Sequence, residues 1–208
     1  MTDQTVSEFH KLYYGCGVHA ETRYQGYEAH KCPLDLRVFQ EILFDVRPGL
    51  VVEIGTNVGG TTPFLAHQLE LLVNGRVISV DNRELPRPSH RRIAYLLGNS
   101  QDPQIVAAVG EAAIATGAAP VIVIHDGDHR YGEVIADLEA YGPLVTPGSY
   151  LIVEDTNVNS HPVLAEWGPG PWEAVETFLK GHPDFEQDRS REKFLMTYNP
   201  GGYLRRRE

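Results

Sequence analysis

Leu50-Val-Val-Glu-Ile-Gly-Thr-Asn-Val-Gly-Gly-Thr61 is the stretch of sequence that decides the fold. Its first five residues form a short apolar run, which predicts a buried strand. The glycines that follow, at positions 55, 59 and 60, allow a sharp turn and a close approach of the backbone to a ligand. Residues 61–72 then have the apolar spacing of a helix. A strand, a glycine turn and a helix in this order predict the first unit of a parallel α/β sheet.

The same alternation of strands and helices extends outward from this unit. Further strands are expected at residues 76–80, 92–97, 121–124 and 149–153, and helices at 34–44, 104–116, 131–141 and 171–179. Near the end of the chain, residues 193–198 and 203–204 flank Asn199-Pro-Gly-Gly202, which predicts an antiparallel hairpin. We therefore expect a mostly parallel seven-stranded sheet in one α/β domain over residues 34–208, with residues 1–33 as an N-terminal extension or lid.

Composition and charge exclude several classes of protein. The chain has 208 residues and a formal net charge of −10, which argues against a nucleic-acid-binding surface. No apolar run approaches the ~20 residues of a membrane helix, and the N-terminus lacks the pattern of a signal peptide. Cys16 and Cys32 cannot form a disulfide framework and are interpreted as free thiols. We expect a cytoplasmic protein without nucleic-acid or membrane partners.

The glycine turn has features of a nucleoside site. Its spacing is Gly-x-x-x-Gly-Gly, which differs from the Gly-x-Gly-x-x-Gly of nicotinamide and flavin binders. With Glu53 before it, the turn resembles the nucleoside-binding loop of methyltransferases, and the Glu53 carboxylate could face a cationic sulfonium. Asp81 ends the second predicted strand, where a carboxylate can accept hydrogen bonds from both ribose hydroxyls. The predicted cofactor-binding residues are Glu53, Gly55, Thr56, Asn57, Gly59, Gly60, Thr61, Asp81, Asn99, Ser100 and Asp126, with Asn99 and Ser100 placed to reach the adenine.

A group of acidic residues follows the fourth and fifth predicted strands. Asp126 and His129 come after one strand, and Glu154 and Asp155 come after the next. Because the carboxyl ends of neighbouring parallel strands face one crevice, these carboxylates should converge and would repel one another without a cation. Oxygen ligands favour Mg²⁺ or Mn²⁺, so we predict a metal site of Asp126, Glu154 and Asp155. The metal would lower the pKa of a substrate hydroxyl, and His129 would act as the general base.

Several blocks of the sequence together resemble a known family. VVEIGTNVGGTT, HDGDH, GSYLIVEDTNVN, GPGPWEAVETFL and KFLMTYNPGGYL, spread over residues 24–206, are similar to the cephalosporin hydroxylase / rhamnosyl O-methyltransferase family. The resemblance implies a Rossmann-like class I methyltransferase fold, S-adenosylmethionine (SAM) and a divalent metal. It extends to macrolide-sugar O-methyltransferases, whose metal ligands and base match Asp126, Glu154, Asp155 and His129. Because the sequence is shorter than those enzymes, we expect it to lack their additional N-terminal domain.

The resemblance and the acidic residues favour a metal-dependent O-methyltransferase that acts on a hydroxyl of a secondary metabolite. We expect this acceptor to be a sugar and the pathway to be antibiotic biosynthesis. A hydroxylase is an alternative, because His129, Asp126 and a distant histidine could imitate the ligands of non-haem iron. A third possibility is a non-catalytic, SAM-binding partner of another enzyme. We also expect a small hydroxylated acceptor, a homo-oligomer, and a lid containing the tyrosines at positions 13, 14, 24 and 27.

Overall fold

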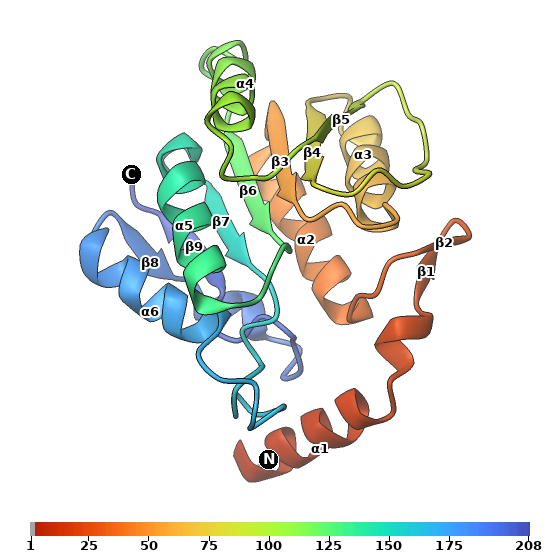
Figure 1. Ribbon diagram of the computed structural model, residues 1–208, viewed down its shortest axis with the longest axis vertical. Coiled ribbons are helices and arrows are strands. Elements are labelled where there is room, and N and C mark those ends of the chain that lie inside the picture. The colour runs from red at the N-terminus through yellow and green to blue at the C-terminus, as the bar shows by residue number, and fades with distance from the viewer. Residues whose placement is uncertain (1–2) are drawn as a thin grey trace.

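A seven-stranded sheet forms the centre of the protein in the computed structural model, which describes residues 3–208 (Figure 1). Its strands run in the order β5-β4-β3-β6-β7-β9-β8. Five are parallel, and β9 and β8 complete the sheet in antiparallel pairings. The bounds are β3 Leu50–Ile54, β4 Arg76–Asp81, β5 Ile93–Leu97, β6 Val121–His125, β7 Tyr150–Val153, β8 Phe185–Gln187 and β9 Tyr203–Arg206. The predicted fold class is thereby confirmed.

Helices cover both faces of this sheet and bury two hydrophobic cores (Figure 1). Side chains alternate along a strand, and within β3 Leu50 and Val52 join one core while Val51 joins the other. The first core is covered by α4, α5 and α6, and the second by α2 and α3. The helix bounds are α2 Pro33–Val46, α3 Thr61–Leu71, α4 Pro103–Ile114, α5 Tyr131–Tyr141 and α6 Pro171–Gly181, close to those expected from the sequence.

The C-terminal antiparallel pair exists, but its first strand is not the one predicted. The strand β8 that pairs with β9 lies at Phe185–Gln187, while residues 193–198 form turns and irregular chain. Asp35 explains this difference, because its buried carboxylate accepts hydrogen bonds from the Thr197 hydroxyl at 2.5 Å and from the Tyr198 backbone N–H at 2.9 Å. Side-chain and backbone donors bound to one carboxylate replace the ladder that a strand would need.

The N-terminal segment is folded and packs beside the sheet rather than in it. It comprises α1 Asp3–Gly15, a 3₁₀ helix at Val18–Glu21 and the short pair β1 Arg23–Tyr24 and β2 Tyr27–Glu28. His10 attaches α1 to the body, since its ring stacks on Tyr198 and lies 3.0 Å from the Asn157 amide nitrogen. Cys16 and Cys32 are free, as predicted. No helix within residues 3–208 combines the length and apolar character needed to cross a membrane.

Candidate active site

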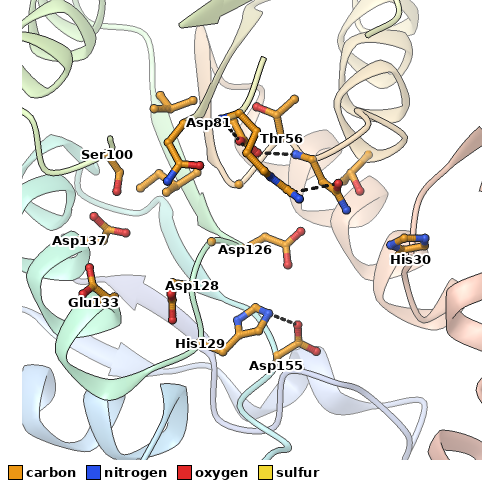
Figure 2. Close-up of a pocket in the computed structure, with 18 of the residues that line it drawn as sticks. His30, Thr56, Asp81, Ser100, Asp126, Asp128, His129, Glu133, Asp137 and Asp155 are labelled. Atoms are coloured by element: carbon orange, nitrogen blue, oxygen red, sulfur yellow. Dashed lines mark hydrogen bonds and ion pairs between the residues drawn. The ribbon is translucent and has the colours of Figure 1, made fainter. Parts of the chain in front are cut away.

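The carboxyl ends of the parallel strands open into a cavity of about 670 Å³. Figure 2 shows Asp81 at one side of it, Ser100 and Asp137 at another, and Asp126, His129 and Asp155 together. Most of the predicted site residues line this cavity: Gly55, Thr56, Asn57, Gly60, Thr61, Asp81, Asn99, Ser100, Asp126, His129 and Asp155. Three do not: Glu53, Gly59 and Glu154.

Two glycines of the loop after β3 allow neighbouring segments to approach it. Gly55 has a φ of 96°, and a Cβ on it would lie 1.9 Å from the carbonyl oxygen of Asp126. A Cβ on Gly60 would lie 2.0 Å from the carbonyl oxygen of Glu28. These glycines therefore allow residues 55–60, here called the cofactor loop, to lie against both the loop that follows β6 and the N-terminal segment.

The carboxylate of Glu53 lies beneath the cofactor loop, and this corrects the expectation that it faces the ligand. Glu53 is 1% exposed, and its Oε2 accepts hydrogen bonds from the Thr62 hydroxyl at 2.6 Å and the Ser79 hydroxyl at 2.5 Å. Because the Ser79 hydroxyl donates its hydrogen bond to Glu53, its oxygen can accept a hydrogen bond from the Thr56 hydroxyl, 2.6 Å away. Burial raises the pKa of Glu53 to about 7. Glu53 thus holds the loop in shape from below.

Asp81 is held in place by the backbone around it. Its Oδ2 accepts the Asn57 N–H at 2.7 Å, and its Oδ1 accepts the Arg83 N–H at 2.7 Å. The Arg87 and Arg83 guanidinium groups also lie 3.5 and 3.6 Å from Oδ1, so Oδ2 is the oxygen with the more open lone pair. Asp81 lines the cavity at the end of β4, where the sequence placed it.

Asp126, His129 and Asp155 converge at the other end of the cavity. One ligand atom from each lies within 4.8 Å of the others, which is the spacing of a metal site. His129 Nε2 lies 3.1 Å from Asp155 Oδ2, and His129 Nδ1 is buried without a partner. Among the residues that the structure describes, this cluster contains a single histidine, which differs from the two histidines of a non-haem iron site.

Lys31 is a site residue that the sequence did not reveal. Its ammonium lies 2.5 Å from Asp126 Oδ2 and 2.7 Å from Glu154 Oε2, and its side chain is 6% exposed. Burial alone would lower the pKa of Lys31, but Asp126 and Glu154 outweigh burial and raise it, so the ammonium stays charged. Lys31 and Glu154 are 123 residues apart, and no local pattern connects them.

Asp126, Glu154, Asp155 and Lys31 form what we call the acidic end of the cavity, and their charges favour a divalent cation. Glu154 is 2% exposed, and while its Oε2 binds Lys31, its Oε1 is buried without a partner. Burial raises the pKa of Glu154, and the Lys31 ammonium opposes that rise. With all three carboxylates ionised, they and the ammonium have a net charge of −2, which one divalent cation would balance. The residues therefore fit a metal ion, although the ligand atoms that lie within 4.8 Å of one another come from Asp126, His129 and Asp155, and the predicted ligand Glu154 is not among them.

The sheet order, the glycine loop and the carboxylate at the end of β4 define a Rossmann-like methyltransferase. The family model described as Rhamnosyl O-methyltransferase/CmcI matches residues 16–207. The chain belongs to this family. The predicted family and the enzyme class, a SAM-dependent O-methyltransferase, are therefore confirmed.

Known proteins extend this match. The rhamnosyl O-methyltransferase of Mycobacterium bovis (strain BCG / Pasteur 1173P2) is 36% identical over 210 residues, which is 98% of this chain and 85% of that protein. That of Mycobacterium leprae (strain TN) is 35% identical over 212 residues, 99% and 92% of the two chains. A CmcI structure described with Mg and SAM has a TM-score of 0.67 at 20% identity and covers 91% of this chain and 78% of its own. A MycE methyltransferase structure with Mg and S-adenosylhomocysteine has a TM-score of 0.53 at 19% identity and covers 85% and 49%.

Proposed function

We propose that this protein transfers the methyl group of SAM to a hydroxyl of a sugar, with Mg²⁺ or Mn²⁺ bound at the acidic end of the cavity. The observation that carries the proposal is that a nucleoside-type site and the acidic cluster line the same cavity. Asp81 and the glycine loop, which fit a nucleoside, share one cavity with Asp126, His129 and Asp155. The names of the mycobacterial relatives support a sugar acceptor, and the CmcI and MycE structures support Mg²⁺.

Asp126 and Asp155 would bind the metal from the cavity, and Glu154 would do so through its unpartnered Oε1. Once bound, the metal supplies a Lewis acid that lowers the pKa of the acceptor hydroxyl and orients it. Lys31 holds Asp126 and Glu154 in place and neutralises one of the charges.

His129 is the proposed general base. Its Nε2 is the ring nitrogen that faces the Asp155 carboxylate, while its Nδ1 is buried without a partner. Nε2 now faces Asp155 Oδ2, 3.1 Å away, so it would take the proton of the hydroxyl only once that carboxylate turns to the metal, and the charge of the nearby Asp155 would then stabilise the imidazolium that results. The Trp167 indole lies near the His129 ring, at 6.5 Å between centroids, and also lines the cavity.

Residues 1–33 are proposed to close the acceptor side of the cavity. Tyr14 and His19 come from this segment and line the cavity together with Tyr198. Their rings contact one another, with the Tyr14 and Tyr198 centroids 5.5 Å apart. Aromatic faces of this kind bind the apolar face of a sugar ring. Lys31 also lies within these residues, so the segment contributes a residue to the acidic end of the cavity as well as forming the proposed lid.

The other sequence-based alternatives receive less support. The single histidine of the acidic cluster does not favour a hydroxylase. A non-catalytic SAM-binding partner would not need a cluster of residues spaced to bind a metal. The cytoplasmic location, the homo-oligomer and a role in antibiotic biosynthesis stay predictions.

Transfer of a labelled methyl group from SAM to simple rhamnosides, with Mg²⁺ or with a chelator, tests the proposal. We expect label in the sugar only when the metal is present, and its loss in His129→Ala. Label that appears equally with the chelator would contradict the metal role. Absence of transfer to rhamnosides and to other hydroxylated sugars would contradict the acceptor class.

A further inference from the structure

One face of α5 is directed at the loop that follows β5. Glu133, Asp137 and Tyr141 are spaced by four residues, and residues with this spacing share a helix face. Glu133 Oε2 accepts a hydrogen bond from the Gln101 side chain at 2.9 Å, and the Tyr141 hydroxyl donates to the Ser100 carbonyl at 2.6 Å. The first and last members of the row therefore hold the loop in place.

Asp137, the middle member, has a different partner. Its Oδ2 lies 3.1 Å from Nε2 of His125, which ends β6 and is fully buried. Its other oxygen, Oδ1, is buried and has no partner. Asp137 is 3% exposed yet lines the cavity, and Figure 2 shows it beside Ser100, away from the acidic cluster. A buried carboxylate oxygen without a donor is unfavourable, which points to a donor that a ligand brings.

The position of Asp137 identifies that donor. An ionised carboxylate only accepts hydrogen bonds, so the ligand must present an N–H or O–H. With the ribose at Asp81, the base of a nucleoside extends toward the ends of β5 and β6, where Asn99, Ser100 and Asp137 line the cavity. The adenine of SAM has an amine at N6, while hypoxanthine has an oxygen there, which a carboxylate would repel.

We propose that Asp137, held by His125, accepts a hydrogen bond from the adenine N6 amine and makes the site select adenine over hypoxanthine. The inference rests on the SAM dependence of the proposed function. Asp137 is then a specificity-determining residue at the nucleoside end of the cavity. His125 positions it and keeps one of its oxygens occupied.

The test compares S-adenosylhomocysteine with S-inosylhomocysteine by calorimetric titration. The wild type should bind the adenosyl compound about tenfold or more tightly, since hydrogen bonds to charged groups are strong and a buried repulsion adds to the difference. In Asp137→Asn, His125 should retain the amide oxygen, and the amide N–H₂ would then face the base. This variant should lose the preference for adenine or reverse it, because the amide donates to the hypoxanthine oxygen.

Glu139→Gln is the matched control. Glu139 lies on the same helix and also pairs with a histidine, His182 at 3.0 Å, but it does not line the cavity. It should keep the wild-type ratio of the two dissociation constants. That ratio is measured on one variant at a time, so partial unfolding of Asp137→Asn does not alter it.

Two results would overturn the inference while leaving the methyltransferase function intact. One is equal binding of the two compounds by the wild type, and the other is an unchanged preference for adenine in Asp137→Asn. Binding of neither compound by the wild type would contradict both the SAM dependence and the inference that rests on it.

Discussion

The two ends of the cavity differ in how their carboxylates are satisfied. At the cofactor end, the chain itself supplies the donors: Thr62 and Ser79 bind Glu53, and backbone N–H groups bind Asp81. At the acidic end, the carboxylates face one another and Lys31 is the single lysine among them. The cofactor end is thus organised by the chain alone, whereas the acidic end is the part that the proposed metal would complete. Changes at the acidic end should therefore respond to metal, and changes at the cofactor end should not.

The largest effect is expected from Lys31→Met. Removing one partner of a buried ion pair leaves uncompensated charge and costs about 3–5 kcal/mol of unfolding free energy. Mg²⁺ should restore part of this loss, because a divalent cation replaces the missing charge. Urea unfolding with and without Mg²⁺ measures both quantities, with Lys193→Met, an exposed lysine paired with Glu41, as the control. A loss that Mg²⁺ leaves unchanged would show that the two ends do not differ in this way.

Asp155→Asn should impair catalysis and leave the cofactor end intact. Asp155 has a φ of 54°, a conformation that Asn tolerates well, so the backbone should be preserved. Loss of a metal ligand should reduce methyl transfer about a hundredfold or more. Steady-state rates and titration of S-adenosylhomocysteine separate the two ends, and Asp184→Asn, which removes a carboxylate that is paired with Arg206 and does not line the cavity, is the control. Cofactor affinity that falls together with the rate would contradict the separation.

Glu53→Gln should stabilise the protein above neutral pH. The pKa of Glu53 is raised by burial from 4.5 to about 7, so the folded state binds the proton more tightly than the unfolded state. The stability that this provides is fully present below pH 4.5 and is lost as the pH rises through about 7. Gln is neutral throughout, and at pH 8 it should recover up to about 3 kcal/mol. Unfolding of both proteins from pH 4 to 8 checks this, and parallel pH curves would refute it.

A smaller effect is expected at the N-terminal segment. Tyr14→Ala removes one ring of the aromatic group with His19 and Tyr198, and should raise the acceptor KM by about fivefold. The KM for SAM should not change. Tyr13, which also contacts Tyr198 but does not line the cavity, supplies the control Tyr13→Ala. Deletion of residues 1–25 extends the test, and unchanged acceptor kinetics there would exclude a lid.

The sequence allowed the parallel strands and their helices to be predicted because each is a local pattern. Asp81 and Asp126 follow directly from strand ends, so their place in the cavity could be predicted too. The first strand of the antiparallel pair was misplaced, since Asp35, 162 residues from Thr197, holds residues 193–198 out of the sheet. Lys31 and Asp137 were missed for a related reason: each acts through partners that only the folded chain brings near.

Glu53 is the predicted cofactor-binding residue whose position differs most from the prediction, which had its carboxylate facing the sulfonium. The pattern that contains it located the loop correctly, but a pattern does not reveal on which side of a strand end a carboxylate lies. The hydroxyls of Thr62 and Ser79, two residues that do not line the cavity, donate to its oxygen. Patterns thus located the site, and only the hydrogen bonds distinguish the residues that contact a ligand from those that support the loop.

Calorimetric titration of SAM into the wild type and into Asp81→Ala, both with Mg²⁺, tests the central claim most directly. We predict that the wild type binds SAM and that Asp81→Ala binds it about tenfold or more weakly, because two hydrogen bonds to the ribose are lost. A wild type that does not bind SAM, or an Asp81→Ala that binds it equally well, would contradict the account.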